Sequence, residues 1–149
     1  MIQVKADLHI HTVLSPCGDL EMSPRNIIDR AVAANIGILG ITDHNSLKQV
    51  GIVERMAAAR GIFVLGGVEV TTREEIHCLA FFPGIPERTE FSKYLEQHQP
   101  FIPNKEELFG YQVVVDEEEL ILEHEEKLLL TDLDQPIGEV AAAVHGPGG

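Results

Sequence analysis

The sequence lacks the features that mark several classes of protein. No apolar run approaches the roughly 18 residues that a membrane-spanning helix needs. The N-terminal stretch MIQVKADLHIH does not follow the basic, apolar and small-residue order of a signal peptide. The two cysteines, Cys17 and Cys78, are too few for a disulfide framework. We therefore expect a soluble, cytoplasmic protein that has no membrane partner.

Basic residues are also scarce. Against 24 Asp and Glu there are 11 Lys and Arg, and the formal net charge is −13 at pH 7. Residues 1–60 contain equal numbers of acidic and basic side chains, so the whole negative excess lies in residues 61–149. Such a surface repels long nucleic acid, and a phosphorylated ligand would need a local metal ion or basic cluster. We interpret the acidic stretch 116–126 as a solvated hairpin face.

The chain has 149 residues, the length of one domain, and its first part alternates between strand and helix patterns. The predicted strands span residues 3–11, 38–42, 62–70 and 77–82. Ser23-Pro24 and Ser46 are predicted to begin the two intervening helices, and Gly37 and Gly61 to end them. This alternation is typical of a parallel α/β sheet or barrel.

The pattern changes after Pro83. The elements predicted beyond it are a short helix within a loop at 91–97, a hairpin of 111–115 with 120–122, a further strand at 128–130 and a last helix at 136–144.

Two histidines share one face of the first predicted strand. Alternate side chains of a strand point the same way and lie about 6.6 Å apart. His9 and His11 are therefore expected on one face at the C-terminal end of the strand, with Asp7 below them. Two imidazoles beside a carboxylate can chelate a borderline metal ion. The alternative is a pair of surface histidines without a ligand.

The next three strands bring further ligand-type side chains to the same rim. Asp43-His44 follows the second strand, Glu69 ends the third and His77 opens the fourth. Active sites of parallel sheets and barrels are built at this rim. The combined pattern predicts a site for more than one metal ion.

The two carboxylates are the candidates for catalytic residues. Glu69 has two oxygens and could bridge paired ions, which activate water and stabilise the attacking and leaving oxygens of a phosphoryl group. Asp43 alternates away from His44, so it could orient a ligand, accept a proton or cap a helix. Cys17, in the loop beyond His11, is either a further ligand or an unligated thiol. Three other histidines lie outside this pattern and are not assigned to the site: His98, His124 and His145.

In order along the chain, DLHIHT, ITDHNS and GVEVTTREEIHCLAFF resemble the early motifs of the PHP family (polymerase and histidinol phosphatase domains), and a weaker similarity continues through FGYQVVVDEEE. The resemblance implies part of a distorted (β/α)7 TIM-like barrel. It also implies a metal-dependent phosphoesterase with up to three divalent ions (zinc, manganese or iron) at the strand C-terminal ends. By position it implies that His9 and His11 bind one ion and that Glu69 bridges this ion to a second one. It implies that His77 binds the second ion and His44 the third. Cys17 stands where many relatives have another histidine for the third ion.

Two features of that family are missing from these residues, namely a histidine after a fifth or later strand and a late Asp-x-His. A closed α/β barrel also usually needs at least about 200 residues. We therefore expect an N-terminal portion of a barrel, completed by a missing C-terminal segment or by a second copy in a homo-oligomer. The expected divisions are 1–83, the first four β/α units with the site motifs; 84–134, an acidic insertion with a β-hairpin; and 135–149, a helix leading into the rest of the barrel.

Three functions are compatible with these residues. The first is hydrolysis of a small phosphomonoester or short nucleotide through metal-activated hydroxide. The second is a metal-binding PHP module without turnover. The third is a metal-dependent amidohydrolase, whose barrel also begins with a His-x-His strand. The third is disfavoured because the following motifs contain Asp-His and Glu rather than a bridging lysine.

Overall fold

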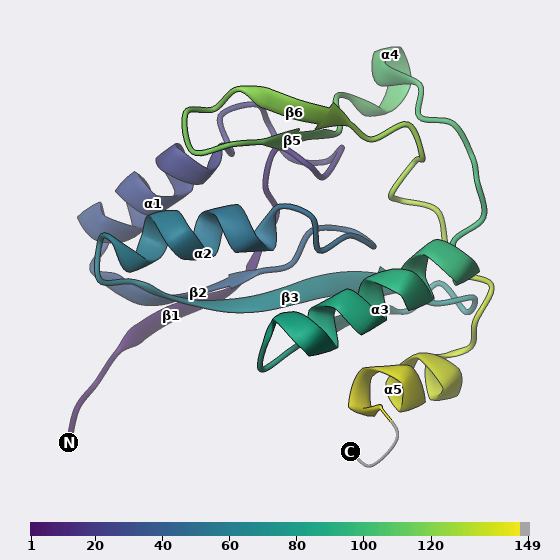
Figure 1. Ribbon diagram of the computed structural model, residues 1–149, viewed down its shortest axis with the longest axis horizontal. Helices are drawn as coiled ribbons and strands as arrows, with labels where there is room; N and C mark the ends of the chain where they lie inside the picture. The colour runs from purple at the N-terminus through teal and green to yellow at the C-terminus, as the bar shows by residue number, and fades with distance from the viewer. Residues whose placement is uncertain (147–149) are drawn as a thin grey trace.

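The computed structural model describes residues 1–146, which form an α/β fold around one curled, four-stranded sheet (Figure 1). The strands lie in the order β1 (Lys5–Ile10), β2 (Ile36–Ile41), β3 (Phe63–Thr71) and β4 (His77–Phe81). Strands β1, β2 and β3 pair in parallel, so their C-terminal ends meet at one rim. The crossover helices are α1 (Pro24–Ala33) and α2 (Val50–Ala58), and both cover the same face of the sheet. The predicted α/β class is confirmed.

The fourth strand departs from the expected alternation of strand and helix. Only residues 72–76 separate β3 from β4, whereas a parallel crossover needs about a dozen residues or more. The two strands therefore pair antiparallel, with Thr71 opposite His77. Because the chain reverses at the rim, the first residue of β4 lies beside the last residues of β3. The reversal is what brings His77 to the same rim as the ends of the parallel strands.

The boundaries of the first two helices follow local signals only in part. Ser23 caps α1 as predicted, since its hydroxyl accepts a hydrogen bond from a backbone N–H of the first turn. The predicted stop at Gly37 is wrong because the chain already turns at Asn35, which has φ 56°, and Gly37 lies within β2. The predicted start of α2 at Ser46 is also wrong. The loop that contains Ser46 is buried and irregular, and the helix begins at Val50.

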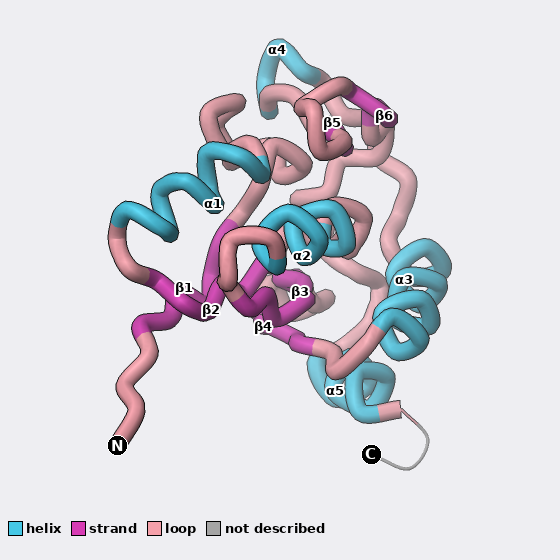
Figure 2. Tube along the Cα trace, turned by 60° about the vertical axis from the view of Figure 1, so that its left-hand side comes forward, coloured by secondary structure: helices cyan, strands magenta, loops and turns pink. Residues whose placement is uncertain are grey.

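The main core fills the space between the sheet and its helices. Ile28 of α1, Ile41 of β2 and Val53 of α2 are almost fully buried in one cluster that extends to Phe91 of α3 (Ile85–His98). Burial of an aliphatic side chain of this size contributes roughly 1.5–3 kcal/mol. Helices α3 and α5 (Ile137–His145) contact each other on the β4 side of the sheet (Figure 2).

The second half of the chain contains more helix and less strand than predicted. The helix expected at 91–97 is longer than predicted, with 14 residues, because it already begins at Ile85. Pro86 stands in its first turn, where a missing N–H costs nothing. Helix α5 lies where the last helix was predicted. The strand expected at 128–130 is absent from the described structure, and its backbone is partnered both by another loop, where Leu128 N–H donates to Ile102 O (2.7 Å), and by buried side chains. Leu129 N–H, for example, donates to the buried amide oxygen of Gln112 (2.8 Å). The part of the division 135–149 that covers residues 147–149 lies outside the described residues.

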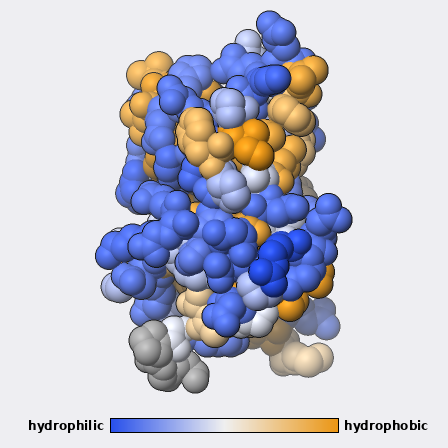
Figure 3. Space-filling view, turned by 90° about the vertical axis from the view of Figure 1, so that its right-hand side faces the viewer, coloured by the Kyte–Doolittle hydropathy of each residue, from blue (hydrophilic) through white to orange (hydrophobic). Residues whose placement is uncertain are grey.

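A small antiparallel pair, β5 (Val113–Val115) with β6 (Ile121–His124), lies above the loop that follows β1. Val113 N–H donates to Val13 O (3.3 Å), and the Gln49 amide bonds both the N–H and the C=O of Val115. Hydrophobic side chains gather toward the end of the molecule where this pair and α4 (Glu106–Phe109) lie, on an otherwise largely hydrophilic face (Figure 3). Among residues 1–146, no helix has both the length and the apolar character required to cross a bilayer.

Gly40 allows β1 and β2 to approach closely, because a Cβ at this position would lie 2.5 Å from Leu8 O and 2.7 Å from Leu8 Cα. The Gly40→Ala variant should therefore displace β1 and lower the free energy of unfolding by roughly 1–3 kcal/mol, measured by urea denaturation. Gly138→Ala in α5 is the control, since its Cβ would meet nothing within 4 Å. It should be neutral or stabilising by up to about 1 kcal/mol. Equal unfolding midpoints for the two variants would contradict this packing.

Candidate metal centre

Side chains from all four strands of the main sheet converge at the rim. His9 lies in β1 and His11 follows it, His44 follows β2, Glu69 lies in β3 and His77 opens β4. An isolated bridge pairs His44 with Glu69 and fixes the register between the end of β2 and β3. Glu69 is only 5% exposed and occupies the middle of the cluster.

The two carboxylate oxygens of Glu69 face different histidines. Oε2 lies 2.7 Å from His9 Nε2 and 2.8 Å from His11 Nε2. Oε1 lies 2.6 Å from His77 Nδ1, and His44 Nδ1 is 4.0 Å from Oε2. A carboxylate with both oxygens placed in this way can hold two cations side by side.

Asp43 fixes the loop that follows β1. Its buried carboxylate accepts hydrogen bonds from the Thr12 N–H (2.7 Å), the Thr12 hydroxyl (2.8 Å) and the Ser15 hydroxyl (2.7 Å). Burial raises the pKa of Asp43, and the hydrogen bonds from Ser15 and Thr12 oppose that shift. Ser15 Oγ also accepts from the His44 N–H (3.1 Å) and lies 3.2 Å from His11 Nδ1. Asp43 therefore orients two of the histidines by way of one serine.

This network determines which nitrogen of His11 is free. Because Ser15 has given its single hydroxyl proton to Asp43, His11 Nδ1 is the donor in its contact with Ser15. A neutral His11 then carries its lone pair on Nε2, which faces Glu69 Oε2 at 2.8 Å and His9 Nε2 at 3.0 Å. The lone pair of His11 Nε2 and the charge on Glu69 Oε2 repel each other at 2.8 Å unless a cation lies between them.

The donor set fits metal ions. Ligand atoms about 2.1 Å from one ion, at right-angle to tetrahedral spacing, are separated by about 3.0–3.4 Å, so binding at His9, His11 and Glu69 requires shifts of only a few tenths of an ångström. The Nδ1 atom of His44 is buried and has no hydrogen-bond partner, as expected for a nitrogen kept for a ligand. Three groups bring their ligand atoms within 4.8 Å of one another: His9, His11 and Glu69; His44, Glu69 and His77; and His11, Cys17 and His44.

Burial and neighbouring groups keep His44 and Glu69 in the forms that bind cations. Burial, aided by the neighbouring His11, lowers the pKa of His44 to about 4, so its imidazole is neutral near pH 7. Burial acts to raise the pKa of Glu69, but hydrogen bonds from His9 and His77 outweigh it, and this pKa lies below its ordinary value. The centre therefore offers an anionic bridge and a neutral imidazole.

The structure brings together the six residues predicted as metal ligands, including Cys17 in its exposed loop. The three unassigned histidines take no part in these groups; His98, for example, contacts Asp134 (2.9 Å). Asp43 lies in the layer behind the ligands. Its partner Ser15 was not predicted, although its place in the loop between His11 and Cys17 is the signal that could have indicated it.

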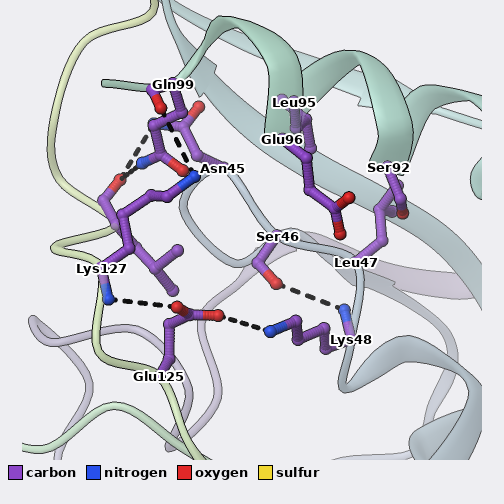
Figure 4. Close-up of a pocket in the computed structure, with 11 residues that line it drawn as sticks. Asn45, Ser46, Leu47, Lys48, Ser92, Leu95, Glu96, Gln99, Glu125 and Lys127 are labelled. Carbon is purple, nitrogen blue, oxygen red and sulfur yellow. Dashed lines mark hydrogen bonds and ion pairs between the residues drawn. The ribbon is translucent and has the colours of Figure 1, made fainter. Parts of the chain in front are cut away.

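Asn45 is a second residue that the sequence analysis missed. It is buried with φ 45°, and its N–H donates to Glu69 O (2.9 Å). Its side-chain oxygen accepts from the Thr71 N–H (3.3 Å), and its amide nitrogen donates to Leu129 O (2.9 Å). Asn45, the residue after His44, therefore connects this loop both to β3 and to the second half of the chain. Figure 4 shows it beside Gln99 in a pocket next to this junction.

Comparison with known families supports the resemblance suggested by the motifs. The family model described as the PHP domain matches residues 7–146, almost the whole chain. This range includes every residue of the three groups of ligand atoms.

Curated relatives match about half of the chain. An uncharacterised protein of Methanocaldococcus jannaschii is 35% identical over 79 residues. A 5′-3′ exoribonuclease of Haemophilus influenzae is 34% identical over 71 residues, and a 3′,5′-nucleoside bisphosphate phosphatase of Chromobacterium violaceum is 38% identical over 74 residues. Each match covers 48% of this chain, but it covers 46% of the archaeal protein and 25% of each bacterial one. The chain thus spans only a part of these relatives.

A crystal structure from Bifidobacterium adolescentis, described there as a candidate metal-dependent phosphoesterase, shares the fold. It superposes with a TM-score of 0.53 over 64% of this chain and 33% of its own, at 23% sequence identity.

Removal of the Ser15 hydroxyl tests the role assigned to the layer behind the ligands. The Ser15→Ala variant should bind Zn²⁺ roughly 10–100-fold more weakly, measured by calorimetric titration of the metal-free chain, because His11 and His44 lose their shared anchor. The control Ser92→Ala removes the same hydroxyl from α3 and should bind like the wild type. Wild-type affinity in Ser15→Ala would contradict the assigned role.

Proposed function

Because this chain belongs to the PHP domain family, we propose that it is a metal-dependent phosphoesterase, or the portion of one that carries most of its metal ligands. The observation that carries this proposal is the placement of Glu69. Its two oxygens face separate histidines, and the free lone pair of His11 points at the same carboxylate. An arrangement of this kind is suited to paired divalent cations.

The residues present fit up to three divalent ions, with zinc, manganese and iron as the candidates for imidazole and carboxylate donors. His9, His11 and Glu69 would hold one ion, Glu69 and His77 a second with His44 nearby, and Cys17 and His44 would hold a third beside His11. When bound, paired ions supply an activated water and stabilise the negative charge of a phosphoryl group.

The protein's own residues hold this arrangement in place. Glu69 joins the two halves of the centre, and Asp43 orients His11 and His44 through Ser15. Because the Asp43 carboxylate is buried and already accepts three hydrogen bonds, we assign it this orienting role rather than proton transfer. Thr12, which gives two of those bonds, keeps the carboxylate turned away from the open rim.

The proposed substrate is a small phosphomonoester or a short nucleotide. The Chromobacterium relative is named as a phosphatase of 3′,5′-nucleoside bisphosphates, which supports this class, and the Haemophilus relative as a 5′-3′ exoribonuclease. The net charge of −13 disfavours a long polyanion, whose phosphates would meet the acidic surface far from any metal ion. A compact phosphoryl group needs to approach only the rim.

We also propose that the four-stranded sheet is the first part of a distorted (β/α)7 barrel, with 84–134 as an insertion and 135–149 leading onward. In support, the outer edge of β1 has no strand partner among residues 1–146. The matches to relatives also cover only 25–46% of their lengths. A C-terminal segment of a longer protein or a second copy would cover this edge.

The Glu69→Gln substitution tests the proposed function because it preserves shape and removes the bridging charge. Wild-type protein purified without chelator should contain two or more equivalents of zinc, manganese or iron and hydrolyse a chromogenic phosphomonoester or a nucleoside bisphosphate. Glu69→Gln should lose at least one equivalent and reduce turnover by about 10³-fold or more. The matched control, Glu75→Gln in the exposed β3–β4 turn, should change neither.

Three results would contradict the proposal. Wild-type turnover in Glu69→Gln would remove Glu69 from the centre. Full metal content in the wild type without hydrolysis of any phosphoester would favour the metal-binding module instead, and hydrolysis of amides in the same preparation would favour the amidohydrolase.

A further inference from the structure

The three groups of ligand atoms share members, but each also has one member of its own. His11, His44 and Glu69 each occur in two groups, whereas His9, His77 and Cys17 each occur in one. Both groups that contain Glu69 offer only nitrogen and oxygen donors. Cys17 adds sulfur to the remaining group, so the three positions differ in chemical character.

The loop that carries Cys17 is held close to the histidines by several contacts. Ser15 N–H donates to Thr12 O (3.1 Å), and Gly18 N–H donates to Ser15 O (2.8 Å). A side chain at Gly18 would collide with the Thr12 carbonyl, so the tight turn requires glycine at this position. Cys17 is exposed, yet its Sγ lies within 4.8 Å of ligand atoms of His11 and His44.

His44, which belongs both to the Cys17 group and to a Glu69 group, indicates a ligand in this cluster. The residue is only 6% exposed, and its Nδ1 has no hydrogen-bond partner although it is buried. A buried polar atom without a partner costs about 1–3 kcal/mol, and a cation in the cluster removes that cost. The one free ring nitrogen of His11 faces Glu69 and His9, so Cys17 and His44 are the two donors left for this position.

We propose that Cys17, with His44 and beside His11, forms a thiophilic position that prefers Zn²⁺, whereas the two positions at Glu69 accept ions such as Mn²⁺ as well. Soft thiolate ligands select zinc and similar ions, and carboxylate donors suit manganese. On binding, the Cys17 thiol releases its proton to solvent and a sulfur–metal bond forms. This inference rests on the proposed function only for the part that the ion plays in phosphoester hydrolysis. The metal position itself can be tested without any turnover.

Cobalt binding reports directly on sulfur coordination. Co²⁺ titrated into the metal-free 149-residue chain should produce the near-ultraviolet absorption of a thiolate–cobalt bond. Cys17→Ser should abolish this absorption. The control Cys78→Ser should retain the absorption, because Cys78, which lies in β4, belongs to none of the three groups. Cys17→His should bind as much Co²⁺ as the wild type without the absorption.

Competition then measures the metal preference. Zn²⁺ should displace cobalt from this position at far lower concentration than Mn²⁺, and Cys17→Ser should weaken one equivalent of Zn²⁺ by at least roughly 10–100-fold while leaving Mn²⁺ binding unchanged. The proposal would be overturned if the thiolate–cobalt absorption survives in Cys17→Ser. It would also be overturned if the wild type binds cobalt without showing this absorption.

The experiment also separates this inference from the proposed function. Glu69→Gln should keep the thiolate–cobalt absorption, because Glu69 is not in the Cys17 group. Absorption in a chain that hydrolyses no phosphoester would leave the thiophilic position standing and remove the proposed activity. Hydrolysis with no thiolate–cobalt absorption would do the opposite.

Discussion

The sharing of the Glu69 carboxylate among histidines of the other strands is the interaction on which the rest of the structure depends. It requires three parallel strands that end at one level and a fourth that reverses there, since His77 reaches Oε1 only because the β3–β4 turn is short. It also requires a close approach of β1 to β2, which Gly40 permits. The fold can be understood as a support that keeps four imidazoles around one anion, with the lone pair of His11 facing that anion, an arrangement suited to cations.

A second layer of residues makes this cluster rigid. Asp43 and Ser15 fix the rings of His11 and the backbone of His44, and Asn45 connects the same loop to β3 and to Leu129. The antiparallel β5–β6 pair covers the loop after β1 through Val13 and Val113. Residues from both halves of the chain therefore stabilise the site, although its candidate ligands all lie within residues 9–77.

Periodicity predicted the parts of the site that depend on regular strands. Alternation placed His9 and His11 on one face, and the ends of parallel strands placed His44 and Glu69 beside them. What could not be predicted depends on tertiary partners. Nothing local distinguishes Ser15 from other loop serines, and the start of α2 moved because Gln49 bonds to Val115, far away in sequence. The short turn before β4 indicates an antiparallel strand, but the alternation of strands and helices earlier in the chain obscured this signal.

Anomalous X-ray diffraction from crystals of this chain grown with Zn²⁺ and Mn²⁺ tests the central claim most directly. The account predicts one anomalous peak among His9, His11 and Glu69 and another between Glu69 and His77. The three imidazole nitrogens in contact with Glu69, from His9, His11 and His77, would then bind ions instead of the carboxylate. Peaks elsewhere with none at Glu69, or histidines that hydrogen-bond the carboxylate directly in the presence of both metals, would contradict it.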